Sequence, residues 1–134
     1  MISIPDSHHD LLKSDIAILA TTGRDGFPQV TAVWFLWDDD GFVKLSLNTV
    51  RQKVKNLLAH NECTLFLIDR ANPTRTLEIR ARAELAPDPN YSFADKLGKK
   101  YGADLRNMDQ PGQSRVVVTL LPVKVNTLDL GKGN

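Results

Sequence analysis

Hydrophobic and polar residues alternate along much of the chain with the two-residue period of β-strands. The clearest case is residues 75–85, where an apolar residue occupies every second position from Leu77 to Leu85 and Thr, Glu or Arg fills the positions between. Such alternation predicts a strand with one buried and one wet face. Further strand-like runs, separated by turns with Gly, Pro or Asp, are residues 14–22, 29–38, 42–47, 63–69 and 114–130. The pattern predicts a mainly β protein.

Two segments have the periodicity of helices instead. The first follows residue 49, and its apolar residues keep the spacing of one helix face: Val50, Val54, Leu57 and Leu58. Thr49 and Gln52 have the Thr-x-x-Gln spacing of a capping box, which predicts where this helix begins. Residues 90–102 predict a second helix that ends at a glycine. The fold class is therefore α+β, mainly β with two helices.

Two of the predicted strands are apolar on both faces. In residues 29–38 and 63–69 few polar residues interrupt the apolar ones, although a strand with one wet face needs polar residues at every second position. One face can be the interior of a small barrel. The other face needs a helix, a ligand or another subunit, and a homodimer supplies such a cover. We therefore expect a homodimer with a large interface.

Length and composition narrow the class of protein. The 134 residues suit a single domain over residues 1–134, with loose tails at about 1–9 and 131–134. The net charge of +1 and the lack of aromatic residues interleaved with basic ones argue against nucleic acid as a partner. No apolar run approaches a membrane span, so we expect no membrane partner. A single cysteine, Cys63, fits a cytoplasmic location and reads as a core residue.

The charge pattern at the first helix is unusual. Residues 41–61 contain four cations, Lys44, Arg51, Lys53 and Lys55, and no acidic residue. Helix N-termini favour acidic side chains, because the free N–H groups and the macrodipole are positive there. Cations at this place are either a solvated face or a site for an anion such as phosphate. The three histidines show no metal-ligand spacing, so we expect no metal site.

The order of these pieces resembles a known family. "DGFPQVTAVWF" followed by "LSLNTVRQKVKNLLAHNECTLFLI" is similar to the pyridoxamine-phosphate-oxidase-like split β-barrel proteins, which bind flavins or deazaflavins. The likeness extends from about Ser14 to Leu130, and it is strongest to the actinobacterial branch that uses coenzyme F-420, a deazaflavin. The resemblance implies a split β-barrel and an oxidoreductase that reduces a small organic substrate by hydride transfer, in which the cofactor supplies the chemistry.

The resemblance also implies the site residues. Arg51 and Lys53 would bind the cofactor phosphate, with Thr49 and Asn56 nearby. The cofactor ring would lie along the second strand, facing Gln29, Val30, Thr31, Val33 and Trp34. Trp34 and Trp37 fall on opposite faces of that strand, so at most one of them lines the cofactor.

Several points stay open at this level. The family's vitamin B6 oxidases carry a C-terminal substrate-binding segment that does not follow Leu130 here, so we expect no such activity. FMN is the alternative to F-420, and a non-catalytic flavin- or tetrapyrrole-binding protein is the alternative to an enzyme. Extra cations for the F-420 tail are available at Lys55, Lys96, Lys99 and Lys100, which read equally well as surface lysines. The catalytic residue is not identified; Tyr91 and Tyr101 are candidate proton donors.

Overall fold

The computed structural model describes residues 2–131 and is dominated by a single antiparallel sheet of seven strands. The elements in chain order are the 3-10 helix η1 (Asp6–Lys13), β1 (Ala17–Thr22), β2 (Pro28–Val33), β3 (Leu36–Trp37), β4 (Val43–Asn48), α1 (Gln52–Ala59), β5 (Glu62–Asp69), β6 (Asn72–Pro87), α2 (Ser92–Tyr101), the 3-10 helix η2 (Leu105–Met108) and β7 (Arg115–Asp129). Two α-helices and a mainly β chain are what the sequence predicts; the two 3-10 helices are additional. None of the helices in residues 2–131 has the length and apolar composition that crossing a membrane requires.

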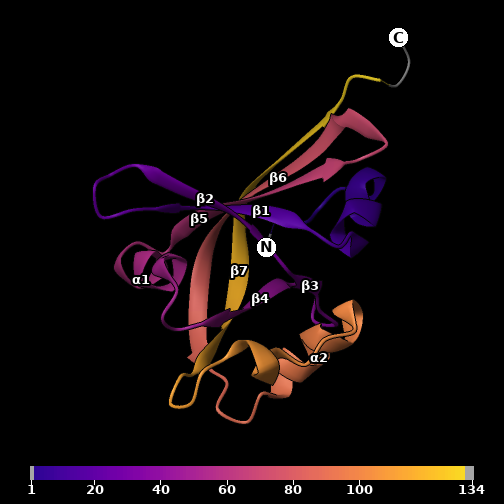
Figure 1. The fold of residues 1–134 in the computed structure, drawn as a ribbon. Helices are drawn as coiled ribbons and strands as arrows, with labels where there is room; N and C mark the ends of the chain where they lie inside the picture. Colours follow the sequence, from indigo (N-terminus) through magenta and orange to yellow (C-terminus); the bar gives the residue numbers. More distant parts are fainter. Residues whose placement is uncertain (1, 132–134) are drawn as a thin grey trace.

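The sheet curls into a split barrel (Figure 1). Its strand order is β2-β1-β5-β6-β7-β4-β3, so β2 and β3 lie at opposite ends of the order although two residues separate them in the chain. The sheet must therefore bend until its two ends approach each other. Along most of their lengths, β2 pairs with β1 alone and β4 with β7 alone. The edges of β2 and β4 border the split, which confirms the predicted fold class.

The predicted strand 29–38 is wrong in one respect, because it is two strands. Trp34 and Phe35 leave the ladder and carry the chain from one end of the sheet to the other. The hairpin with β4 then comprises two residue pairs, Leu36 with Lys44 and Trp37 with Val43. One continuous strand is ruled out, since β2 and β3 belong to opposite ends of the sheet.

The interior is filled by the inward faces of the strands. The alternation predicted for residues 75–85 is confirmed, because Leu77, Ile79 and Ala81 are at most 2% exposed while Arg80 and Arg82 are exposed. The same period holds in β1 and β5. The most deeply buried residues of the other strands are Leu19, Leu45, Leu65, Leu67, Val118 and Leu120.

Helix α1 begins later than the capping box predicts. Its N-cap is Arg51, and no side chain caps it. The Thr49 hydroxyl donates instead to the Ser114 carbonyl at 3.2 Å, and the Gln52 amide donates to Asn56 Oδ1 at 2.9 Å. The predicted capping box is therefore wrong: the tertiary contact with Ser114 takes the hydroxyl that the box requires.

The apolar face predicted for this helix is confirmed only in its middle. Val54 and Leu57 are each 1% exposed and pack into the core. Val50 precedes the helix and is 53% exposed, and Leu58 is 72% exposed.

The N-terminal segment packs more closely than a loose tail. Residues 6–9 belong to η1, and His8 is 4% exposed with Nε2 3.3 Å from the Leu128 carbonyl oxygen. Arg75 fastens the segment, since its guanidinium binds the Asp10 carboxylate and the Ser7 carbonyl. The predicted looseness is thus wrong for residues 6–9. Met1 and residues 132–134 of the predicted tails lie outside the described residues.

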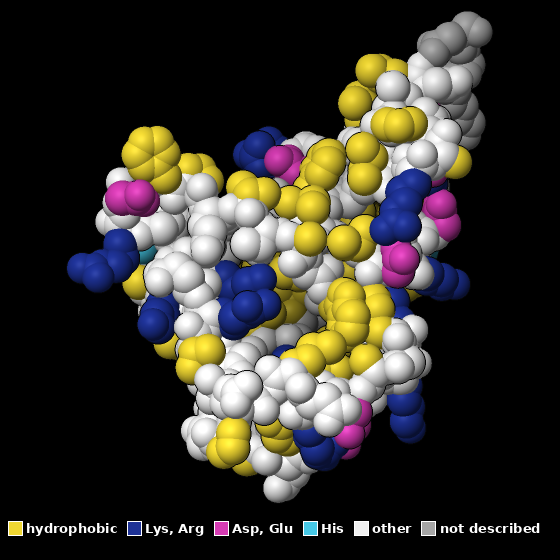
Figure 2. All heavy atoms as spheres, in the orientation of Figure 1, with side chains coloured by type: hydrophobic (Ala, Val, Ile, Leu, Met, Phe, Trp, Pro, Cys, Tyr) yellow, Lys and Arg dark blue, Asp and Glu magenta, His cyan; other side chains and the backbone are white. Residues whose placement is uncertain are grey.

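The outer face of the sheet carries apolar side chains that this single chain does not cover. Figure 2 shows them as a band over the upper part of the molecule. The exposed apolar residues of the strands include Val30, which is 61% exposed, Ile68 at 40%, Val123 at 43% and Leu128 at 45%. The outer face is thus apolar on β2 and β5, as the patterns of residues 29–38 and 63–69 predict, whereas β6, between β5 and β7, carries the exposed Arg80 and Arg82 there.

Candidate functional site

A cavity of about 540 Å³ lies in the split of the barrel. The end of β2 and Trp34 form one side, and residues 46–48 of β4 form another. The start of α1 and the segment from α2 to β7 complete the lining. Figure 2 shows Lys and Arg atoms beside a hollow in the middle of the molecule. The curl of the sheet therefore places four separate segments around one space.

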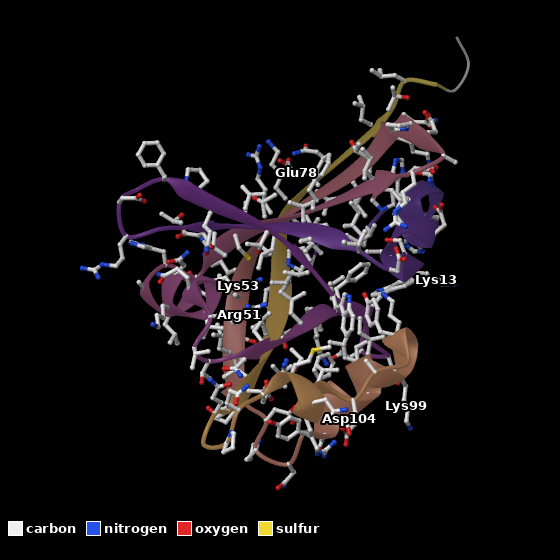
Figure 3. The ribbon with its side chains drawn as sticks, viewed as in Figure 1. Lys13, Arg51, Lys53, Glu78, Lys99 and Asp104 are labelled. Carbon is white, nitrogen blue, oxygen red and sulfur yellow. The ribbon has the colours of Figure 1, made fainter. Side chains whose placement is uncertain are left out.

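Arg51 and Lys53 form the cationic wall of this cavity (Figure 3). Lys53 is 7% exposed, and neither side chain has a hydrogen-bond or ion-pair partner among residues 2–131. Burial, together with the nearby Arg51 charge, lowers the pKa of Lys53 below its usual range. The stem of Lys53 is buried, whereas its ammonium is open to the cavity and has no acceptor within the described chain. The site thus has cationic charge to offer an anion.

A network of amides and hydroxyls lies behind this wall, between α1 and the β1–β2 hairpin. Asn56 is 2% exposed and donates to Thr21 Oγ1 at 3.0 Å and to Gln29 Oε1 at 2.9 Å. These contacts hold the helix against the sheet. Thr31 Oγ1 is buried and has no partner in the described chain.

The residues predicted from the sequence divide into three groups. Four of them line the cavity: Arg51, Lys53, Val33 and Trp34. Asn56, Gln29 and Thr31 lie in or beside the network behind it and do not line it. Thr49 is bound to Ser114, and Val30 is on the exposed outer face of β2. Neither of these last two belongs to the cavity of this chain, because the local turn and the strand alternation direct them elsewhere.

A second wall contains a buried ion pair that the sequence reasoning missed. Arg115 is 7% exposed, and its Nε and Nη2 donate to the Asp109 carboxylate at 2.8 and 3.0 Å. The Arg115 Nη1 group donates to the Ser46 carbonyl at 3.2 Å. Tyr91 and Asn48 also donate to Asp109, at 2.6 and 2.9 Å. Burial alone would raise the pKa of Asp109, but these hydrogen bonds outweigh it and lower the pKa.

The loop before β7 has no hydrophobic periodicity that would indicate these residues from the sequence. Asn48 and Arg115 are 67 positions apart, and only the register of β4 against β7 sets them side by side. The weak signal in the sequence was the polar stretch "NMDQPGQSR" directly before a long strand.

The aromatic side of the cavity is held by α2. Trp34 stacks on Tyr101 with ring centres 4.3 Å apart and planes inclined by 5°. The Tyr101 hydroxyl accepts from the Phe35 N–H at 3.0 Å, so α2 fixes the chain where it leaves β2. Trp37 does not line the cavity and packs against His9 instead.

The candidate proton donors and tail-binding lysines lie away from the cavity. The hydroxyls of Tyr91 and Tyr101 are engaged by Asp109 and by the Phe35 backbone, and neither tyrosine lines the cavity. Lys96 binds Asp38 and Asp39. Lys100, Lys55 and Lys99 also lie outside the lining.

Comparisons with known proteins identify the family and the fold of this chain. The family model for pyridoxamine 5'-phosphate oxidase matches residues 4–129. A structure described as an F420 reductase is 34% identical and has a TM-score of 0.79, and the match covers 92% of this chain and 98% of that one. A conserved hypothetical protein from Mycobacterium tuberculosis is 25% identical with a TM-score of 0.76, over 96% of this chain and 86% of the other.

The fold is shared more widely than the sequence. The heme storage protein HutZ from Vibrio cholerae is 14% identical with a TM-score of 0.73, over 95% of this chain and 96% of that one, which shows a common fold alone. A comparison with curated proteins gives no match. The family match over residues 4–129 and the F420 reductase at 34% identity identify the chain as a member of the pyridoxamine 5'-phosphate oxidase family.

Proposed function

We propose that this protein is an oxidoreductase that binds coenzyme F-420 in the split of the barrel and reduces a small organic substrate by hydride transfer. The observation that carries the proposal is the pair Arg51 and Lys53, which lines the cavity without any partner in the described chain. The family and the likeness to an F420 reductase support the same class of chemistry.

The donors present suit a phosphate group. Lys53 and Arg51 offer charge-assisted hydrogen bonds to its oxygens, at the start of a helix whose dipole is positive there. A bound anion would supply the acceptor that the Lys53 ammonium lacks within the described chain. FMN carries a phosphate as F-420 does, so FMN remains the alternative cofactor.

The chain's own contribution to the reaction is to bind and to orient. Arg51 and Lys53 hold the phosphate, and Trp34, fixed by its stack on Tyr101, supplies a rigid apolar wall. The cofactor, when bound, supplies the hydride chemistry.

Titration of the purified protein with F-420 and with FMN tests the cofactor site. Lys53→Met keeps the alkyl stem and removes the charge, and Arg51→Ala removes the second cation. Each loss of a charge-assisted contact costs about 1.5–3 kcal/mol, which is about a ten- to hundred-fold weaker Kd. Lys55→Ala is the matched control, because Lys55 is exposed on the same helix and does not line the cavity. If both site variants bind either cofactor as tightly as wild type, the phosphate assignment is wrong.

Turnover separates an enzyme from a protein that only binds or stores its ligand. Reduced F-420 should be reoxidised by a suitable organic acceptor in the presence of catalytic amounts of the protein. Binding without any turnover across a panel of acceptors would favour the non-catalytic alternative.

We also propose that the functional unit is a homodimer, in which a second copy covers the exposed apolar face of the sheet. Val30 on β2, Ile68 on β5 and Val123 on β7 would be buried there, and burial of apolar area is the main driving force of such association. Light scattering at micromolar concentration should give the mass of two chains. A stable monomer would contradict the proposal.

A further inference from the structure

We infer that the side-chain amide of Gln113 is the donor that orients the substrate, and that the substrate is a small neutral molecule with a carbonyl-type oxygen. This inference rests on the proposed function, because it concerns the part of the same cavity that the cofactor leaves to the substrate. Three observations support it: the turn of residues 110–113 is held by hydrogen bonds, these bonds fix the orientation of the Gln113 amide, and the nearby charge of Arg115 is paired with Asp109.

Two hydrogen bonds between Gln110 and Gln113 close the turn that carries Gln113. The Gln113 N–H donates to the Gln110 carbonyl at 3.1 Å, and the Gln110 N–H donates to Gln113 Oε1 at 2.9 Å. Pro111 and Gly112 occupy the central positions, and Gly112 has φ of 84°. Proline followed by a residue of positive φ is the signature of a type II turn. The Gln113 side chain therefore starts from a fixed backbone.

The same contacts determine which way the amide faces. A backbone N–H can only donate, so the Gln113 atom that Gln110 N–H contacts must be the oxygen. A second donor, Asn48 Nδ2, reaches the same oxygen at 2.8 Å. The orientation of Asn48 is itself fixed, because its Oδ1 accepts from the Val50 N–H at 3.0 Å.

The nitrogen of Gln113 is left to face a ligand. With Oε1 held by two donors, Nε2 offers two N–H groups, and neither has a partner among residues 2–131. Gln113 is half-buried and lines the cavity. A donor placed this way selects a ligand that carries an acceptor atom.

The charge on this wall indicates a neutral ligand. Arg115 is the nearest cation in sequence, but its Nε, Nη1 and Nη2 already donate to Asp109 and Ser46. The charges of Arg115 and Asp109 neutralise each other. The polar groups that this wall presents to a ligand are therefore neutral. Leu105 and Met108 line the same cavity and suit the apolar part of such a molecule.

Gln113 belongs to a different wall from the proposed cofactor contacts. The phosphate is assigned to the start of α1 and the ring to β2, whereas Gln113 lies in the loop between η2 and β7. The substrate must approach the cofactor from a side that the cofactor does not occupy, and this loop forms one such side of the cavity.

The test uses the protein loaded with whichever of F-420 or FMN binds, and acetophenone and ethylbenzene as probes. The two probes differ by one carbonyl oxygen. In 1H–15N spectra of the wild type, acetophenone should shift the Gln113 side-chain amide resonance and bind more tightly than ethylbenzene, which should leave that resonance in place. This measurement needs no variant, so a folding defect cannot obscure it.

Gln113→Glu is the matching variant, because it keeps the oxygen that Gln110 and Asn48 contact and replaces the donor nitrogen by an acceptor. Acetophenone should bind about two- to ten-fold more weakly, because the donor nitrogen is lost. The cofactor Kd is measured beside it, since the new carboxylate shares the cavity with Arg51 and Lys53. Asn107→Ala, an exposed residue outside the cavity, should change neither Kd.

Two results would overturn the inference while leaving the proposed function intact. One is equal affinity of the loaded wild type for acetophenone and ethylbenzene. The other is an unchanged Gln113 side-chain amide resonance when acetophenone binds. If neither cofactor binds wild type at all, the proposed function itself fails, and the inference fails with it.

Discussion

Arg115 and Lys53 are two cations of equal burial in one cavity, and they differ in their partners. Each is 7% exposed. Arg115 is held by Asp109 and Ser46, whereas Lys53 has neither an acceptor nor a carboxylate within the described chain. Burying a charge is costly unless it is paired. The chain itself supplies the counter-charge at Arg115, whereas the Lys53 ammonium is open to the cavity, where we propose that a ligand supplies its acceptor.

Breaking the paired side of this comparison should have the largest effect. Asp109→Asn leaves the buried Arg115 without its counter-charge, and such a loss costs about 3–5 kcal/mol of unfolding free energy. Urea denaturation of the protein measures it. The matched control is Asp95→Asn, which breaks the exposed pair of Asp95 with Arg106 and should cost less than about 1 kcal/mol.

A similar small loss in Asp109→Asn and Asp95→Asn would show that Arg115 is not stabilised by its pair. In that case Arg115 would join Lys53 as a cation free to bind a ligand, and the distinction between the two walls would disappear.

The unpaired side should behave in the opposite way. Lys53→Met removes a cation from a helix start and from a site beside Arg51, so the unfolding free energy of the cofactor-free protein should stay constant or rise by about 0.3–1 kcal/mol. Denaturation without and with saturating cofactor measures it. The stabilisation by cofactor should be smaller in the variant, since the variant binds it more weakly. A loss of stability in the cofactor-free variant comparable to that of Asp109→Asn would contradict the ligand role.

Lys100 lies between these extremes, because its only acceptor within the described chain is a neutral carbonyl. Its ammonium donates to the neutral Phe35 carbonyl at 2.8 Å and lies 3.8 Å from the centre of the Phe35 ring. Burial lowers the pKa of Lys100 to about 8, with a weak opposing influence of Asp15. The unfolded chain therefore binds more protons than the folded one between pH 8 and the ordinary lysine pKa of about 10.4, and this group's contribution to stability rises with pH in that window.

Lys100→Met lacks this titration. The difference in unfolding free energy, wild type minus Lys100→Met, should therefore increase as pH rises from about 7 to about 10. Urea denaturation of both proteins across this range measures the difference, and comparison with the variant removes the contribution of other titrating groups. A difference that does not change with pH would show that Lys100 titrates normally.

The sequence alone determined the features that depend on neighbouring residues. Strand alternation in residues 75–85 predicted the buried faces of β6, because a strand turns successive side chains to opposite sides. The excess of cations around residue 51, against the helix dipole, pointed to Arg51 and Lys53, which do line the cavity. Local rules also placed both α-helices to within about two residues.

The tertiary structure decided what depends on residues far apart in the chain. The strand order breaks residues 29–38 at Trp34, and the contact with Ser114 takes Thr49 out of its predicted cap. The register of β4 against β7 joins Asn48 to the loop of Asp109 and Gln113. These pairings follow from how the whole sheet closes, so no local period in the sequence encodes them, and they select which of the chain's many polar side chains have partners and which remain free to bind.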